Sequence, residues 1–146
     1  MVRNENIRFL IKPEYFVTFA FTLLILPFKW VVAWIASCAF HEICHYTAIR
    51  LSGCKIFCIE IGAEGIVIDT EFHNNIQELI CALSGPVGGF LLILMGKWFP
   101  RLAICGFFQS AYNLLPIYPL DGGRAVRCIL QQLFPAPLPV PFSFCF

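Results

Sequence analysis

Residues 30–49 read WVVAWIASCAFHEICHYTAI, and this stretch decides the fold class and points to the chemistry. It is apolar except for His41, Glu42 and His45, and it ends at Arg50. A helix that crosses a bilayer needs about 20 residues at a rise of about 1.5 Å per residue. The sequence therefore predicts a membrane-spanning helix that carries three ionisable side chains.

The composition of the whole chain agrees with a membrane protein. Of its 146 residues 59% are hydrophobic and 13% charged, against about 45–50% and about 25% in soluble domains. A soluble fold of this size has too little interior to bury so much apolar surface, and a disordered chain would be more polar. The net charge of +1, with no Lys/Arg cluster beyond what membrane flanks need, argues against a nucleic-acid partner. The eight cysteines are scattered through apolar stretches, so we expect reduced, apolar side chains.

Three further apolar stretches predict helices over Tyr15–Phe28, Ile76–Gly96 and Leu102–Tyr118. The first is short, and we expect it to borrow Phe9–Ile11 or to thin the bilayer. A short amphipathic helix is expected over Ala125–Phe134. The predicted fold class is therefore an α-helical polytopic membrane protein with about four transmembrane helices.

Residues 51–74 have a different pattern. Lys55–Ile61 and Ile66–Phe72 are rich in Ile, Val and Phe, and they flank a tetrapeptide bounded by Gly62 and Gly65. This pattern predicts a small β-hairpin between the second and third membrane helices. We assign residues 1–134 to one core domain and 135–146 to an extended, proline-rich tail.

The distribution of basic residues predicts the orientation in the membrane. With four crossings, seven of the ten Lys/Arg residues fall on one side, which places the amino terminus in the cytoplasm. Arg3, Arg8 and Lys12 before an apolar run also resemble a signal peptide, but Lys29 interrupts that run. We therefore expect the first segment to be a retained anchor.

Two local patterns describe how the later helices pack and end. Gly85 and Gly89 form a GxxxG pattern, whose small residues let helices approach closely in lipid. Pro116 and Pro119 end the fourth helix and favour extended backbone. We expect this extended segment to carry Asp121 inward from the cytoplasmic side.

The pattern His41-Glu42-Ile43-Cys44-His45 indicates a metal site. Residues four apart share a helix face, so both imidazoles can reach one ion, while Glu42 lies close enough to accept a proton from metal-bound water. A chance HExxH is expected roughly 0.003 times in a chain of this composition. The alternative is a hydrogen-bonded histidine pair with Glu42 as its partner. Each ionisable group at the bilayer centre costs about 2.5–3.5 kcal/mol, which favours the functional interpretation.

Zinc needs a third protein ligand beside a position left open for water. Glu64 has a spacing that some soluble zinc peptidases use, but it lies in a glycine-bounded turn. His73 lies in a polar loop, where solvation is the simpler expectation. Asp121 is the strongest candidate, and its alternative role is a helix cap paired with Arg124.

Together these motifs give the chain a family resemblance. HEICH at 41–45, Ser84-Gly85-Pro86, and NLLPIYPLDGGR at 113–124 resemble the site-2 protease family of intramembrane zinc metalloproteases. The likeness covers residues 9–130 and is greatest to the sporulation branch typified by stage IV sporulation protein FB. It implies one Zn²⁺ per chain held by His41, His45 and Asp121, with Glu42 as catalytic base. It further implies that Asn113 positions the substrate or the oxyanion.

The same resemblance implies a zinc metalloendopeptidase that hydrolyses a peptide bond of a membrane-tethered protein. It also implies a multi-pass protein of a bacterial cell membrane. Family members generally carry more membrane helices, and often a PDZ or CBS domain, so we expect a bare catalytic core or a truncated product.

A substrate helix must unwind before its carbonyl groups can be attacked, and the hairpin could then pair with the unwound strand. We expect substrate contacts at Ile59, Ile66 and Pro116. Two other classes stay open, namely an inactive zinc-binding membrane regulator and a small transporter subunit. Glu42→Gln separates the three, because only a protease loses turnover while keeping its zinc.

Overall fold

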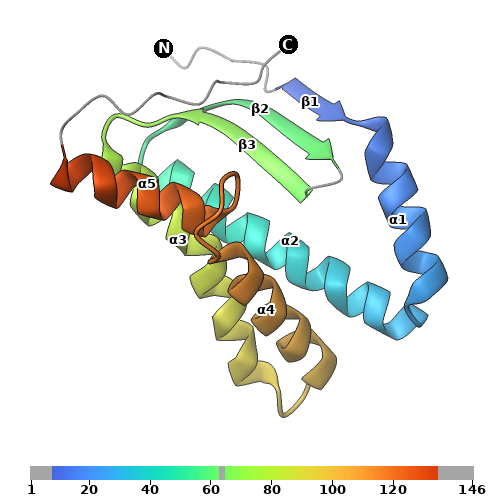
Figure 1. Cartoon of the computed structure of the whole chain (residues 1–146). Helices are drawn as coiled ribbons and strands as arrows, with labels where there is room; N and C mark the ends of the chain where they lie inside the picture. Colours follow the sequence, from blue (N-terminus) through green and yellow to red (C-terminus); the bar gives the residue numbers. More distant parts are fainter. Residues whose placement is uncertain (1–7, 63–64, 135–146) are drawn as a thin grey trace.

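A computed structural model describes residues 8–62 and 65–134 of the chain, so Arg3, Glu64 and the predicted tail at 135–146 lie outside the described residues. Figure 1 shows a small sheet lying along α2, with α3, α4 and α5 together on the other side of α2 and α1 apart from them, joining β1 to α2. In chain order the elements are β1 (Arg8–Ile11), α1 (Pro13–Ile25), α2 (Phe28–Leu51), β2 (Lys55–Gly62), β3 (Gly65–Glu71), α3 (Asn75–Leu91), the 3-10 helix η1 (Leu92–Met95), α4 (Pro100–Asn113) and α5 (Asp121–Leu133).

The helices form where the apolar stretches predict them, with shifted ends. α1 is shorter than expected, because Leu26 is extended and Pro27 precedes a new helix that begins at Phe28. At the other end of α2, Gly53 takes a left-handed φ of 71°, which lets the chain turn back into β2. α3 begins at an N-cap in which the Asn74 side chain accepts a hydrogen bond from the Gln77 amide at 2.8 Å.

The predicted hairpin is confirmed, but it belongs to a three-stranded sheet in the order β1-β2-β3. β2 pairs antiparallel with β3 and parallel with β1, where Phe9 aligns with Ile59 and Ile11 with Ile61. Our expectation that Phe9–Ile11 extends the first membrane helix is therefore wrong. Pro13 starts α1 immediately after the strand. The Lys12 amide donates to the Ile61 carbonyl at 2.8 Å, which fixes the segment beside β2.

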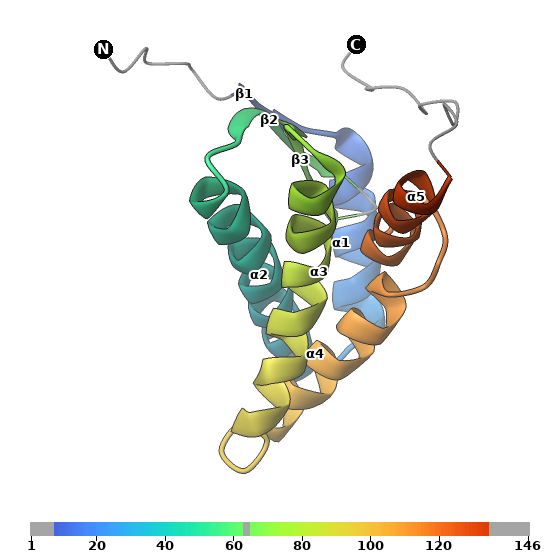
Figure 2. The same cartoon turned by 90° about the vertical axis from the view of Figure 1, so that its left-hand side faces the viewer.

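α3 is the central helix of the bundle and packs against α2, α4 and α5 (Figure 2). Its glycines make these contacts close. A Cβ at Gly88 would lie 2.3 Å from Cys44 Sγ of α2, and one at Gly89 would lie 2.1 Å from Ser110 Oγ of α4. α2 and α4 are also joined by a buried hydrogen bond of 2.7 Å from Ser37 Oγ to Gln109 Oε1. The predicted small-residue packing of the third helix is therefore confirmed, and it involves two neighbouring helices.

The apolar surface is only partly covered. Beneath the sheet, a small core cluster consists of Ile49, Cys54, Ile56 and Cys81. α1 in contrast has no buried residue, and side chains such as Leu24 are 85% exposed. Within the described residues, one helical run, Asn75–Met95, is long and apolar enough to cross a membrane, and Pro13–Ile25 is apolar but shorter.

Candidate metal centre

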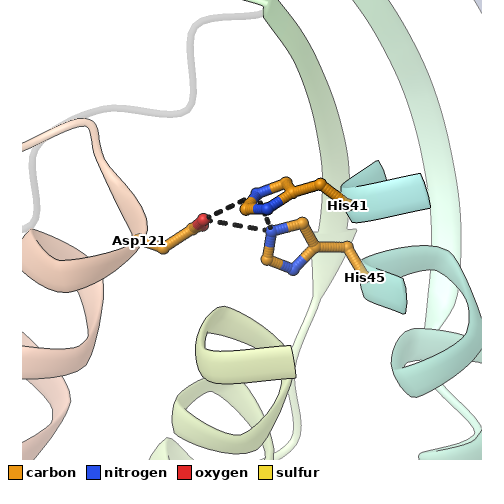
Figure 3. A group of neighbouring side chains, drawn as sticks. All are labelled: His41, His45 and Asp121. Atoms are coloured by element: carbon orange, nitrogen blue, oxygen red, sulfur yellow. Dashed lines mark hydrogen bonds and ion pairs between the residues drawn. The ribbon is translucent and has the colours of Figure 1, made fainter. Parts of the chain in front are cut away.

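Three side chains from two helices converge on one point beneath the sheet (Figure 3). His41 and His45 project from the same face of α2, and both are buried. Asp121, the first residue of α5, approaches from the opposite side. The Nε2 atoms of the two histidines are 3.1 Å apart, and Asp121 Oδ2 lies 3.2 Å from His41 Nε2 and 3.1 Å from His45 Nε2. The predicted convergence of residues 41, 45 and 121 is present.

These spacings match the requirements of a tetrahedral metal ion. Zinc binds imidazole nitrogen at about 2.0–2.1 Å and carboxylate oxygen at about 2.0–2.2 Å, so neighbouring ligand atoms of a tetrahedron lie about 3.3 Å apart. The three observed separations are 3.1, 3.1 and 3.2 Å. No other group of three His, Cys, Asp or Glu side chains in the described part of the chain has this arrangement.

A hydrogen bond fixes the ring of His45. His45 Nδ1 lies 2.7 Å from the Cys81 carbonyl and 3.3 Å from Ser84 Oγ, and that hydroxyl itself donates to the same carbonyl at 2.7 Å. The carbonyl can only accept, so the proton of the neutral ring resides on Nδ1. Nε2 is left free to bind a metal, which is the arrangement found around metal-ligating histidines.

Gly85 leaves the space in which the ligands meet. A Cβ at this position would lie 2.2 Å from His45 Nε2 and 2.7 Å from His41 Nε2. Any side chain larger than hydrogen would therefore occupy the ligand positions. The GxxxG pattern predicts close packing at Gly85, but it did not reveal that the neighbouring atoms are the histidine ligands.

Residues 114–120 form consecutive turns that bring Asp121 to the centre. Our prediction of an extended segment here is wrong, although the expected inward course of the chain is confirmed. The turns are possible because Gly122 packs directly on the Leu114 carbonyl and Gly123 on Ile117, where a Cβ would lie 2.2 and 2.5 Å from backbone atoms.

The partners of Asp121 exclude its alternative role as a helix cap. Leu120 occupies the N-cap position, and Arg124 is paired with Glu78 instead of Asp121. Burial raises the pKa of the Asp121 carboxyl, but hydrogen bonds with His41 and His45 outweigh burial and lower that pKa to about 2. The carboxylate is thus ionised at neutral pH, as a metal ligand must be.

Two further predicted site residues lie beside the centre. Asn113, the last residue of α4, places its Nδ2 3.4 Å from His41 Nε2. Glu42 is partly buried and close enough to interact electrostatically with His45 and Asp121. His73, the alternative third ligand, is exposed in the loop before α3 and lies outside the cluster.

The three residues expected to contact substrate lie in different surroundings. Ile59 is on β2, which is paired on both sides, and its side chain packs against the core cluster. Ile66 is partly buried on β3, the outer strand, and Pro116 is exposed in the turns before α5. Of the two strands, only β3 has a side without a partner strand in the described part of the chain.

Comparison with known proteins supports the fold. No family model matches the chain. A zinc metalloprotease from Methanocaldococcus jannaschii is 26% identical over 122 residues, which cover 72% of this chain and 36% of the relative. The chain thus spans about a third of that protein. A solved structure, the site-2 protease from Methanocaldococcus jannaschii, superimposes with a TM-score of 0.68 at 20% identity, over 92% of this chain and 72% of that one. The chain therefore has a site-2 protease fold.

Proposed function

We propose that this chain is an intramembrane zinc metalloprotease that hydrolyses a peptide bond of a membrane-tethered protein. The observation that carries the proposal is the meeting of two imidazoles and the Asp121 carboxylate, whose ligand atoms lie within 3.2 Å of one another. A second carboxylate, that of Glu42, lies beside them on the helix of the histidines. The zinc metalloprotease and the site-2 protease to which the chain is similar support the same assignment.

His41, His45 and Asp121 would hold the ion. Two nitrogen donors and one oxygen donor leave one tetrahedral position open, the pattern of catalytic rather than structural zinc sites. Zinc in such a site supplies a water whose pKa is lowered to about 7. The hydrogen bond from His45 Nδ1 to the Cys81 carbonyl keeps that ring oriented for binding.

Glu42 and Asn113 would act on the reacting groups. Glu42 accepts a proton from the attacking water and later delivers it to the leaving amine, which is general base and then general acid catalysis. The Asn113 side-chain amide lies beside His41 and donates a hydrogen bond toward the oxyanion that develops on the scissile carbonyl.

A bilayer accounts for the apolar exterior. α1 has no buried residue, and large apolar side chains are exposed along α1, α3 and α4. Soluble proteins rarely expose contiguous apolar patches of this kind. We propose that α1, α2, α3 with η1, and α4 cross the membrane, with the amino terminus in the cytoplasm, as the excess of basic residues on that side indicates.

β3 is the strand on which we place the substrate. β2 is paired on both sides over Cys58–Ile61, so an unwound substrate cannot pair with it there. The outer side of β3 near Ile66 would receive the substrate main chain by strand addition, and Pro116 would contact it from the turns before α5.

The decisive experiment compares wild type with Glu42→Gln in detergent-purified protein. Both proteins are assayed for zinc content and, by co-expression, for cleavage of a panel of single-span membrane proteins. We expect about one zinc per chain in both and a loss of turnover of about 10²–10⁴-fold in the variant. Glu14→Gln, which changes an exposed glutamate of α1, is the matched control and keeps both properties.

Other outcomes would contradict the proposal in distinct ways. A wild type that binds no zinc removes the metal site. If Glu42→Gln keeps the cellular function of the wild type, the chain is a zinc-binding regulator. If the same variant changes metal flux across vesicles, the chain is a transporter subunit.

The place of the substrate has its own test. Proline is introduced one position at a time as Ile66→Pro, Val67→Pro and Ile68→Pro, and cleavage and zinc content are measured. Where the replaced amide faces outward, cleavage falls while zinc and folding are retained, because only the pairing with substrate is lost. If all three folded variants cleave at the wild-type rate, β3 does not receive the substrate.

A further inference from the structure

We infer that Glu78 of α3, with Arg124 and Arg127 of α5, forms a positioning cluster that holds Asp121 at the metal centre. The inference rests on the proposed zinc site, but it concerns residues that touch neither metal nor substrate. The three residues are called the Glu78 cluster below.

The geometry of the Glu78 cluster is that of a largely buried carboxylate between two guanidinium groups. Arg127 Nη2 donates a hydrogen bond to Glu78 Oε1, and Arg124 Nε lies 3.6 Å from the same oxygen. The Glu78 side chain is only 12% exposed, against 28% for Arg124 and 23% for Arg127. The Arg124 guanidinium also lies over the Phe72 ring, 5.7 Å from its centre. Charge-assisted contacts shielded from water in this way are stronger than exposed pairs.

The packing of the helices explains why Asp121 needs such a link. The two histidines belong to α2, whereas Asp121 belongs to α5, and α5 packs mainly on α3 rather than on α2. The position of the carboxylate relative to the imidazoles is therefore transmitted through α3. α3 contacts the histidines at Gly85 and Ser84, and it contacts α5 at Glu78.

The positions of Arg124 and Arg127 along α5 connect their contact with Glu78 to the orientation of Asp121. Arg124 is three residues after Asp121, so both lie on one face of the helix, and Arg127 follows one turn later. Cys128, seven residues after Asp121 and four after Arg124, lies on the same face and is fully buried, so this face is the one that packs inward. The ion pairs of Arg124 and Arg127 with Glu78 thus fix the rotation of α5 and with it the direction in which Asp121 points.

Zinc tolerates little error in ligand position. Ligand distances in metal sites hold to within about 0.2 Å, so a small rotation of α5 would remove Asp121 from the ion. A cluster that served only stability would loosen α5 without changing the coordination of the metal. The two roles are therefore separated by metal binding, measured on folded protein.

The test uses Co²⁺ as the probe, because its visible absorption reports the number and geometry of its ligands. Affinity is measured by competition with a chelator for wild type, Glu78→Gln, Arg127→Gln and the double variant, with circular dichroism to confirm folding. Glu60→Gln is the matched control, since Glu60 forms an ion pair of 3.2 Å with Lys12 and is not part of the group His41, His45 and Asp121. His41→Ala is the control without a complete site.

We expect each single variant of the Glu78 cluster to bind Co²⁺ about 10-fold more weakly, at the low end of the range for residues that orient metal ligands. Its spectrum should also be altered, as expected when Asp121 no longer coordinates. The double variant should lose little more than Glu78→Gln alone, because that change already breaks the contact with Arg127. Glu60→Gln should keep the wild-type affinity and spectrum.

Wild-type affinity and spectrum in either folded single variant would overturn the inference while leaving the proposed function intact. Additive losses in the double variant would overturn it too, since the two residues would then act separately. A wild-type protein that binds neither Co²⁺ nor Zn²⁺ refutes the proposed function itself, which makes the two failures distinguishable.

Discussion

Gly85→Ala should destroy the metal site while leaving the fold largely in place. The added Cβ would lie 2.2 Å from His45 Nε2, 2.6 Å from His45 Cε1 and 2.7 Å from His41 Nε2. To restore an ordinary contact of 3.4 Å, His45 Nε2 would have to retreat by about 1.2 Å. Metal–ligand distances tolerate about 0.2 Å, so the required movement is several times larger than the site allows.

The expected effect on metal binding is correspondingly large. We predict that Gly85→Ala weakens Zn²⁺ and Co²⁺ binding by about 100-fold or more, the upper end of the range for altered ligand surroundings. Overpacking a helix contact also costs about 1–3 kcal/mol of stability. The assay is chelator competition on detergent-purified protein, with thermal unfolding of the metal-free form measured in parallel.

A neighbouring glycine supplies the control that isolates the cause. Gly88→Ala places a Cβ 2.3 Å from Cys44 Sγ, on the same helix and against the same neighbour α2, but away from the ligands. It should lower the free energy of unfolding by a similar amount and keep metal affinity within a few-fold of wild type. If Gly85→Ala binds metal as tightly as wild type, the geometry of the centre described here is wrong. Equal losses of affinity in both variants would show that general misfolding of α3 is the cause.

Three other perturbations test separate parts of the site. Asn113→Ala should lower kcat by about 10²–10³-fold with zinc content unchanged, because an oxyanion donor is lost and no ligand is; a variant that loses zinc instead would make Asn113 part of the metal site. Ser84→Ala should weaken zinc binding by less than 10-fold, since the Cys81 carbonyl still holds His45 at 2.7 Å; a complete loss in the chelator assay would assign the orienting role to the hydroxyl. Removing zinc should lower the melting temperature, and added zinc at 100 times its Kd should restore about 2.7 kcal/mol; a melting temperature independent of zinc would mean that the ion does not bind the folded chain preferentially.

The parts of the fold that sequence predicts are those encoded by local pattern. The apolar stretches predicted α2 to within two residues at each end, and α3 together with η1 to within one, because long apolar runs have few alternative structures. The hairpin was equally accessible from its β-branched residues and flanking glycines. β1 was not, because Arg8–Ile11 is too short to show a strand period and forms only by pairing with a strand some fifty positions later.

The candidate site likewise has a part that local sequence pattern predicts and a part that depends on tertiary packing. The spacing of His41 and His45 places both imidazoles on one helix face, whatever the rest of the chain does. The sequence favours Asp121 as the third metal ligand but does not settle that role, since its approach depends on turns at 114–120 and on glycines packed against the backbone. Glu78 and Arg127 carried no signal in sequence, and Arg124 was considered only as a partner of Asp121, because ordinary charged residues become a cluster only when α5 docks on α3.

The separation of the ligands along the chain has a consequence for biosynthesis. Asp121 follows His41 by 80 residues, and it reaches the centre only after α5 has docked. During translation the nascent polypeptide therefore exposes two imidazoles long before a complete coordination shell exists. Capture of an ion by all three ligands must therefore wait until α5 has left the ribosome and docked on α3.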